Sequence, residues 1–460
     1  MVKVRETFCK VGVLMALVLG MSMVTPAAAQ SPALQALIED ALKTHPLVEQ
    51  TALEYWAGSE KYFAANGIND WNLFLSASLK KGLGSQGFNS FSDDGQYHEF
   101  STGGSRVFSA TGTRLKVAAG YTALIDQPAF GGFESPNTYK PNISFTITQP
   151  LLKNAWGLMD RYPIQSAGIG QRLALIKYHE DLESLVEVLV GAYLDWQLAE
   201  VKTDIFEKQL QAATQQKDVT TRQFNRGAAE KSDLILAQQN EVSKRMQYLQ
   251  EKVNLNHQIL QIETIINREL SSLDVDPSSF LTQVNLPTRN LTSSLAHLVG
   301  SGNIIETFRL SAELQALNVS AKKNQREADL SVFLTNESGA SNTTWDTSVN
   351  DVGANQSLTT GVALNIPLEN NVAVSDYNTA VLNYDSLIIS QNSTLSTLKG
   401  TITSQYYHLD SLELLLGQAS ELVKLAKQTA KIESTKHRQG RTASLYVVLD
   451  TQDKALSAQL

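Results

Sequence analysis

Residues 395–426, LSTLKGTITSQYYHLDSLELLLGQASELVKLA, repeat a mainly apolar position at alternating steps of three and four residues. This seam consists of Leu395, Leu398, Ile402, Gln405, Leu409, Leu412, Leu416, Ala419, Val423 and Ala426. A sustained three-four spacing is typical of coiled-coil helices. It recurs earlier in the chain, at Leu182, Leu185, Leu189, Ala192, Trp196 and Ala199. The sequence therefore predicts two long coiled-coil helices.

The ends of these helices are marked by glycine-bearing turns. The predicted helices run from about Arg161 to Gly227 and from about Ala373 to Gly440, and at about 1.5 Å per residue each is roughly 100 Å long. Glycine suits the left-handed residue that ends many helices. The two turns comprise Asn225, Arg226, Gly227 and Ala228, and Gln439, Gly440, Arg441 and Thr442. Helix resumes after each turn, to Leu270 in the first case, whereas the second return helix stops at Leu460, and we expect it to be truncated or unusually short.

Several short segments alternate with period two and predict strands. They occur at 71–79, 143–147, 330–334 and 362–366, and residues 82–140 otherwise have the composition of long polar loops. The run from Arg114 to Tyr121 is either an extra strand or an extension of one. Together these features predict an α+β protein.

The order helix, strand, polar loop, strand, Pro-Leu, long helix occurs twice and predicts an internal duplication. The first repeat spans 30–273, with helices at 31–65, strands and loops at 71–149 and long helices at 150–270. A linker follows at 274–290. The second repeat spans 291–460, with helices at 292–329, strands and a loop at 330–367 and long helices at 372–460.

Residues 1–29 have the pattern of a secretory signal peptide: basic residues, an apolar run and Ala27-Ala28-Ala29. The only cysteine, Cys9, lies inside it, so disulfides, thiol catalysis and a lipidated N-terminal cysteine are excluded after cleavage. The net charge is −8 with a pI near 5.5. With no basic patch in the sequence, a nucleic-acid partner is not expected.

The motifs of catalysis are missing from the sequence. Gly82 to Gly87 fits G-x-G-x-x-G, but no helix pattern follows to hold a pyrophosphate. The histidines are scattered, and His179-Glu180-Asp181 lacks the second histidine of a metalloprotease site. Asp93-Asp94 lies in a polar loop. We therefore expect neither an enzyme, nor a cofactor, nor a metal.

These residues together resemble the TolC family of bacterial outer-membrane efflux channels. The resemblance rests on Thr146-Ile147-Thr148-Gln149-Pro150-Leu151-Leu152 before a long helix, its weaker echo Leu364-Asn365-Ile366-Pro367-Leu368, and the two turn glycines. Ser232 and Asp233 follow the first glycine at the family's spacing, and Val448-Leu449-Asp450 follows the second. The likeness covers about residue 31 to the end.

The resemblance implies a homotrimer in which four strands per protomer build one shared β-barrel in the outer-membrane lipid. The long antiparallel helices would form an α-barrel in the periplasm. Substrate would pass passively from an inner-membrane pump and a periplasmic adaptor to the exterior, with the adaptor docking on residues 225–228 and 439–442. No cofactor is implied.

The resemblance also implies a gate at the inner entrance. Asp450 matches one aspartate of the family's acidic rings, and three copies around a pore axis would favour cations. The other family aspartate falls at Tyr446 or Val447, so this sequence departs from a two-ring gate. Arg441 and Asp233 are further candidates, as ion-pairing residues of closed tips.

Two other functions fit the sequence pattern. The same fold could be the exit duct of a one-step protein secretion system, which differs only in its pump. A periplasmic coiled-coil scaffold without a pore would explain the seams but not the repeated strand, Pro-Leu and helix units.

Overall fold

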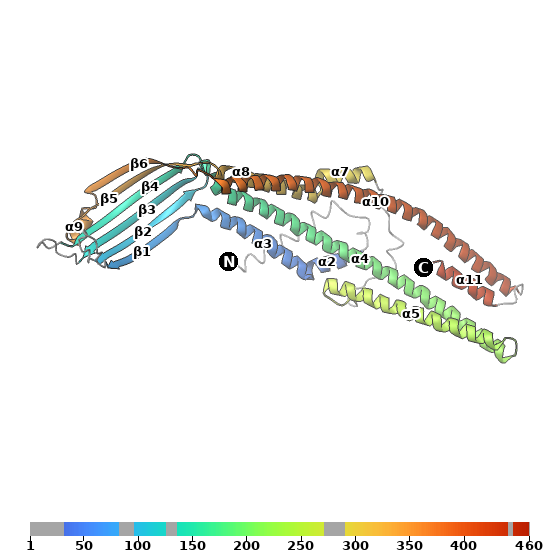
Figure 1. The fold of residues 1–460 in the computed structure, drawn as a ribbon. Coiled ribbons are helices and arrows are strands. Elements are labelled where there is room, and N and C mark those ends of the chain that lie inside the picture. Colours follow the sequence, from blue (N-terminus) through green and yellow to red (C-terminus); the bar gives the residue numbers. More distant parts are fainter. Residues whose placement is uncertain (1–31, 82–95, 126–135, 271–289, 440–444, 460) are drawn as a thin grey trace. The chain divides into compact units, whose positions relative to one another are not determined.

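A computed structural model describes residues 32–81, 96–125, 136–270, 290–439 and 445–459. The predicted signal peptide, nearly all of the linker, and Gly440, Arg441 and Thr442 lie outside these residues. The structure combines long helices with an antiparallel sheet (Figure 1), which confirms that part of the predicted fold. The chain divides into two compact units, one of Met1–Ala52, Tyr178–Gly300 and Ser396–Leu460, and one of Leu53–Lys177 and Ser301–Leu395.

The helices are long where the seams predict them. Helices α4 (Leu158–Asn225) and α10 (Asn371–Arg438) each contain 68 residues. The other α-helices of the described residues are α2 (Pro32–Thr44), α3 (Pro46–Asn66), α5 (Lys231–Ile266), α7 (Leu291–Ser301), α8 (Asn303–Gln325), the short α9 (Trp345–Asn350) and α11 (Leu445–Ser457). None of the described helices combines the length and the apolar composition needed to cross a membrane.

The sheet belongs to the second unit and contains six strands in sequential order: β1 (Asn72–Lys81), β2 (Gln96–Phe108), β3 (Thr113–Ile125), β4 (Thr138–Pro150), β5 (Asp329–Gly339) and β6 (Asn355–Asn365). Each strand is antiparallel to the next (Figure 1).

The expected number of four strands is therefore wrong for the described sheet, which has six. The β2–β3 hairpin lies where a long polar loop was expected, and Arg114 to Tyr121 belongs to the separate strand β3. The β2 sequence QYHEFSTGGSRVF contains two adjacent glycines and few apolar residues, so period-two alternation is hidden in it.

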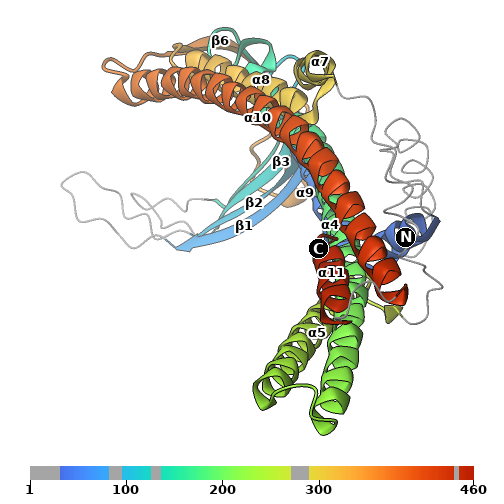
Figure 2. The same cartoon turned by 90° about the vertical axis from the view of Figure 1, so that its right-hand side faces the viewer.

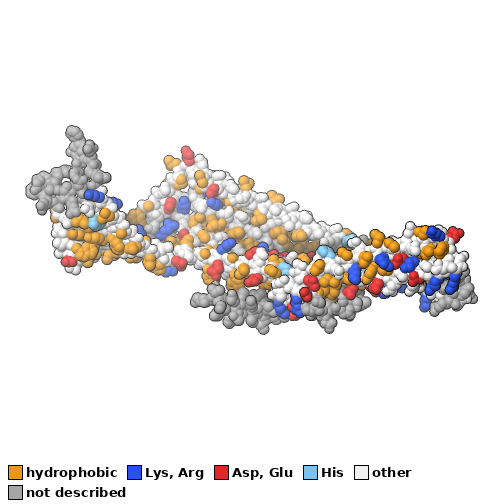
Figure 3. Space-filling view, turned by 90° about the horizontal axis from the view of Figure 1, so that it is seen from below, with side chains coloured by type: hydrophobic (Ala, Val, Ile, Leu, Met, Phe, Trp, Pro, Cys, Tyr) orange, Lys and Arg blue, Asp and Glu red, His pale blue; other side chains and the backbone are white. Residues whose placement is uncertain are grey.

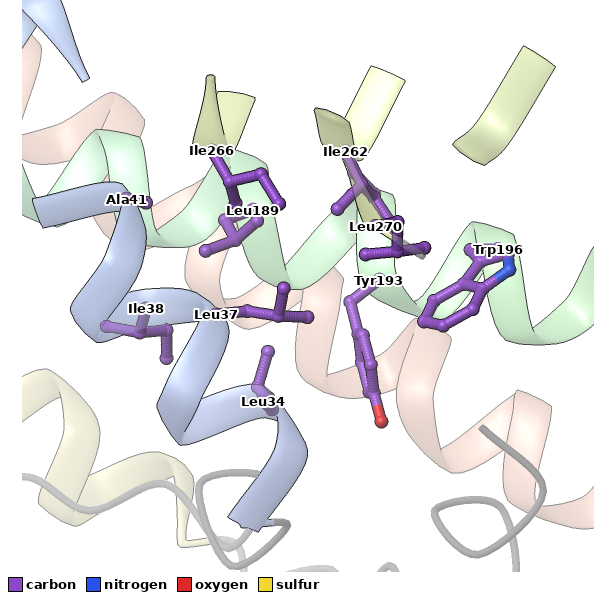
Figure 4. Close-up of a cluster of buried hydrophobic side chains, with 11 residues drawn as sticks. Leu34, Leu37, Ile38, Ala41, Leu189, Tyr193, Trp196, Ile262, Ile266 and Leu270 are labelled. Carbon is purple, nitrogen blue, oxygen red and sulfur yellow. The ribbon is translucent and has the colours of Figure 1, made fainter. Parts of the chain in front are cut away.

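The first unit has its core where α2, α4 and α5 meet (Figure 4). The segments of α4 and α5 in this unit lie side by side (Figures 1 and 2). Buried apolar side chains come from all three helices: Leu34, Leu37, Ile38, Ala41, Leu189, Ala192, Tyr193, Trp196, Ile262 and Ile266, with Leu270 just beyond α5. Thr44 donates a 2.6 Å hydrogen bond to the Ile266 carbonyl, and Arg268 forms a 2.8 Å ion pair with Asp40. These contacts tie α2 to the end of α5.

The two seams differ in burial. All six seam residues of α4, from Leu182 to Ala199, are buried, as the spacing predicts. In α10 the middle of the seam is exposed, with Leu409, Leu412 and Leu416 at 41%, 45% and 68%. A seam of leucines in contact with water is unfavourable at about 25 cal/mol per Å² of apolar surface. This part of α10 therefore presents an apolar stripe that no other described part of the chain covers, as is typical of an interface.

Candidate functional site: a two-faced sheet and the helical turns

One face of the sheet is apolar across all six strands. Side chains alternate along a strand, and directly paired residues share a face, so the register defines its members. They include Leu73, Leu75, Ala77, Leu79, Phe100, Leu115, Val117, Ala119, Tyr121, Ile143, Phe145, Ile147, Val332, Leu334, Leu358, Val362 and Leu364. Many of these side chains are exposed, up to 84% for Leu73. Figure 3 shows hydrophobic side chains gathered over the strands at the left of the view.

The opposite face of the sheet is polar. It carries Ser76, Ser78, Lys80, Glu99, Ser101, Ser105, Arg114, Lys116, Asn142, Ser144, Thr146, Thr335, Glu337, Ser357 and Thr359. Neighbouring strands are linked there by side chains: Lys80 forms a 2.9 Å ion pair with Glu99, Asn142 donates to Glu337 at 3.0 Å, and the hydroxyls of Thr146 and Thr335 lie 3.1 Å apart. One face thus suits hydrocarbon and the other suits water.

Aromatic side chains flank the apolar face at two levels. At one level, the Arg106 guanidinium lies 6.0 Å from the Trp71 ring centre and 5.2 Å from that of Phe108. At the other level, Tyr121 packs edge-on against Trp345 at 4.4 Å and stacks with Tyr139 at 6.4 Å. Thr113, which pairs with Phe108, is roughly 26 Å from Tyr121 along β3 at about 3.3 Å per residue. Strands of outer-membrane sheets tilt by about 35–45°, so this distance corresponds to a height of roughly 20 Å, comparable with the apolar band of about 25 Å that lies between aromatic girdles.

Two glycines on the polar face lie beneath phenylalanine rings. Phe74 pairs with Gly103, and a Cβ at Gly103 would come within 2.8 Å of that ring. Phe333 pairs with Gly361 in the same way, at 2.7 Å. A ring that covers a cross-strand glycine shields its backbone from water. In the described strands, Phe74 and Phe333 are the large aromatic residues in the middle of a strand on this face. Each ring lies against the glycine opposite it.

The junction from β4 to α4 contains the Pro150-Leu151 motif and is tightly held. The Leu151 amide donates to the Leu330 carbonyl at 2.7 Å. The buried Asn154 has a left-handed φ of 63°, accepts a 2.8 Å hydrogen bond from the Met159 amide and donates to Asp160 at 2.7 Å. These bonds satisfy orphan groups at the first turn of α4.

The β2–β3 turn packs directly against this junction. Gly157 has a φ of 64°, and a Cβ added to it would lie 1.9 Å from the Ser109 carbonyl oxygen. Gln149 donates to the Thr111 carbonyl at 2.9 Å and accepts from the Thr113 hydroxyl at 2.6 Å. The hairpin is therefore anchored at its turn as well as along its strands.

The turn after α4 has the geometry that the sequence predicts. Gly227 has a φ of 71°, which confirms a left-handed residue there. The Ala228 amide donates to the Gln223 carbonyl at 2.8 Å, and the Gly227 amide donates to the Phe224 carbonyl at 2.9 Å. This pair of bonds is a Schellman motif. Of the second turn, only Gln439 is described, and its amide donates to the Thr435 carbonyl at 3.0 Å.

The described gate candidates, Asp233 and Asp450, bond to different partners and not to each other. Asp233 accepts a 3.0 Å hydrogen bond from the Glu230 amide and so caps the start of α5. Asp450 forms a 2.7 Å ion pair with Lys454, one turn later on α11. That hydrogen bond raises the pKa of Lys454 above its ordinary value. Arg441 lies outside the described residues, so an ion pair between Arg441 and Asp233 stays a prediction.

A polar cluster missed in the sequence joins α4, α5 and α11. Gln209 is 1% exposed, donates to the Ser457 hydroxyl at 2.9 Å and accepts from Lys244 at 3.1 Å. Lys244 also forms a 3.1 Å ion pair with Asp453. These residues lie far apart in the sequence, and no spacing rule connects them. They connect α11 to α4 and α5 by polar contacts, in addition to its buried Val448 and Leu449.

No group of histidine, cysteine, aspartate and glutamate suited to a metal ion occurs among the residues that the structure describes.

Known structures with a similar fold include bacterial outer-membrane proteins. The outer membrane protein VceC of Vibrio cholerae matches with a TM-score of 0.65 and 16% identity, over 94% of this chain and 91% of that one. CusC, whose structures concern folding and transmembrane channel formation, matches with a TM-score of 0.66 and 14% identity over 94% and 87%. The outer membrane channel CmeC of Campylobacter jejuni matches with a TM-score of 0.62 and 16% identity over 93% and 81%.

No protein-family model and no curated protein sequence matches the chain. The structural likeness nevertheless extends over nearly the whole chain and agrees with the resemblance to the TolC family seen in the sequence. The chain has the fold of the bacterial outer-membrane channels.

Proposed function

We propose that this chain is the outer-membrane channel of an efflux system, a member of the TolC family that conducts small molecules passively. The observation that carries this proposal is the sheet with one apolar and one polar face. Its strands of 10 to 13 residues are long enough to cross a bilayer as tilted β-strands. The two aromatic levels support the same assignment.

The remaining parts of the proposal come from the fold and the resemblance. The resemblance supplies three copies. Their sheets join into one closed β-barrel, because open sheet edges are not tolerated in lipid. The helices form a periplasmic tunnel, and the exposed part of the α10 seam supplies apolar surface for assembly. A periplasmic adaptor docks on the helical turns, and an inner-membrane pump provides the energy.

The first test separates inner from outer membranes of cells that express the full-length protein. After extraction in mild detergent, the mass of the particle is measured. A trimer from the outer-membrane fraction is the expected result. A monomer or dimer in the periplasmic fraction would refute the channel and favour a scaffold.

A tip-turn variant tests adaptor docking. Gly227→Pro should strongly reduce resistance to toxic small molecules while the amount of trimer stays normal. Proline fixes φ near −65° and removes the amide that bonds the Phe224 carbonyl, so the Schellman turn cannot form. Gly227→Asn is the control, because asparagine tolerates the left-handed region. Minimum inhibitory concentrations and immunoblots measure both effects, and full resistance in the proline variant would argue against docking at this turn.

A pair of variants on α11 tests the gate. Asp450→Asn should lower the preference for cations about twofold, whereas Lys454→Gln should raise it, since an unpaired ring of carboxylates attracts cations more strongly. The ammonium group of Lys454 is charged at neutral pH, and its pKa is raised further by the hydrogen bond to Asp450, so it offsets that carboxylate. Reversal potentials in planar bilayers give the selectivity. Asp410→Asn serves as a control, and an unchanged selectivity in both α11 variants would remove Asp450 from the gate.

A further inference from the structure

The β2–β3 hairpin lies inside the sheet and not beside it. β1 pairs with β2 over its full length, from Asn72 opposite Ser105 to Lys81 opposite Gln96. β3 pairs with β4 from Arg114 opposite Thr148 to Leu124 opposite Thr138. The hairpin therefore separates β1 from β4 by two complete strands.

Contacts at the turn of the β2–β3 hairpin fix the hairpin in its place between β1 and β4. The Ser109 amide donates a hydrogen bond to the side-chain oxygen of Asn69 at 3.0 Å. The Gln149 side chain on β4 donates a 2.9 Å hydrogen bond to the Thr111 carbonyl. The turn packs so closely on Gly157 that a side chain at this position would not fit. The close contact between Gly157 and the Ser109 carbonyl requires a glycine, which is expected only if the hairpin turn stays packed against the β4–α4 junction.

The two faces of the sheet continue through the hairpin without a break. Phe100, Val117 and Ala119 extend the apolar face, and Ser101 and Lys116 extend the polar face. Each hairpin strand has 13 residues, about 43 Å at roughly 3.3 Å per residue. That length exceeds what a tilted strand needs to cross the hydrocarbon core.

β1 and β6 are the edge strands of the described sheet. Because all neighbours are antiparallel and the sheet has six strands, β6 of one copy can continue onto β1 of a second copy in the same alternating order. Leu73 and Leu75 on β1 and Val362 and Leu364 on β6 belong to the apolar face, so this joint preserves the faces. Closure within one copy is disfavoured, since even eight strands leave an interior only wide enough for side chains.

We propose that the β2–β3 hairpin is part of the membrane-spanning sheet, and that three copies of this chain join β6 to β1 to close an eighteen-stranded barrel. This inference rests on the proposed function, which supplies the trimer and the membrane. The diameter of a barrel grows roughly linearly with strand number, so this barrel is about 1.5 times as wide as a twelve-stranded one at equal tilt. The hairpin also adds Glu99, Arg114 and Lys116 of each copy to the water-filled interior.

The first experiment uses single cysteines in the full chain, with reagent access as the readout. The only natural cysteine, Cys9, lies in the predicted signal peptide. Ser101→Cys places a thiol on the polar face of the hairpin, and Ala119→Cys places one on the apolar face near the same depth. A hydrophilic, membrane-impermeant maleimide should label Ser101→Cys at least about tenfold faster, because charged reagents are excluded from hydrocarbon.

The matched pair outside the hairpin is Ser144→Cys and Ile143→Cys on β4. Preferential labelling of Ser144→Cys supports the membrane-spanning sheet in general and so tests the proposed function alone. If the β4 pair shows this preference but Ser101→Cys and Ala119→Cys label equally, the hairpin stands in water and the inference is overturned. If neither pair shows it, the proposed function itself fails.

The second experiment counts strands by disulfide formation. Ser76→Cys on β1 is combined in turn with Ser357→Cys, Thr359→Cys and Ala363→Cys on β6, all on the polar face. One of these pairs should give covalently linked trimers on a non-reducing gel. The contrasting pair is Ser76→Cys with Ser144→Cys, whose strands lie about 14 Å apart at roughly 4.8 Å per strand, too far for a disulfide. A disulfide within one chain in this pair would place β1 beside β4 and overturn the inference.

Discussion

Replacement of Ile143 by arginine is expected to remove most of the trimer from the outer membrane. Ile143 lies in the middle of β4, on the apolar face of the sheet, and its side chain is 50% exposed. An arginine facing the middle of the bilayer costs about 2–4 kcal/mol. Every copy carries the change, and each 1.4 kcal/mol is tenfold in an equilibrium constant. Quantitative immunoblots of outer-membrane fractions measure the loss.

The control for this prediction is the next residue along β4. Ser144→Arg puts the same side chain on the polar face, next to Glu337 on β5. Its guanidinium would be hydrated and close to a carboxylate, so the amount of trimer should stay within about twofold of normal, as for most exposed substitutions. Equal losses for the two variants would show that charge at this depth is harmful on either face. That result would contradict the assignment of one face to lipid.

The sequence alone predicted the features that depend on local spacing. The α4 seam is visible because a single buried stripe repeats over many turns, and all six of its residues are buried. Gly227 is visible because a left-handed helix end strongly favours glycine. Both signals are contained in a few consecutive residues.

The hairpin was missed because its signal is diluted. On the apolar face β2 presents His98, Phe100, Thr102 and Gly104, so only one large apolar residue marks the alternation. Thr102 is acceptable there because its hydroxyl bonds the Phe74 carbonyl at 3.2 Å. A strand in the middle of a sheet gains stability from both neighbours, and intrinsic propensity is a weak guide to such a strand.

The polar cluster on α11 was missed for a different reason. Gln209, Lys244 and Asp453 belong to three helices, and only the tertiary fold brings them together. Asp450 was singled out from the sequence, but its partner Lys454 was not. An ion pair one turn apart is a common feature of exposed helices, and the resemblance drew attention to the carboxylate alone.

Gly157→Ala is expected to destabilise the trimer by about 2–5 kcal/mol. The residue has a φ of 64°, and a left-handed conformation costs alanine about 1–2 kcal/mol. The added Cβ would also lie 1.9 Å from the Ser109 carbonyl oxygen, which is backbone and cannot rotate away. Overpacking of this kind typically costs about 1–3 kcal/mol. The temperature at which the detergent-extracted trimer dissociates should fall clearly.

Gly170→Ala is the matched control for this last prediction. Gly170 lies within α4, and a Cβ there would meet nothing within 4 Å. Alanine in a helix interior should stabilise by about 0.5–1 kcal/mol, so the dissociation temperature should stay the same or rise. If Gly157→Ala behaves like this control, the β2–β3 turn does not pack on the β4–α4 junction. The hairpin would then have no contact that fixes it to the start of α4. A dissociation temperature that falls for Gly157→Ala but not for Gly170→Ala is expected if the hairpin turn packs firmly on the start of this long helix.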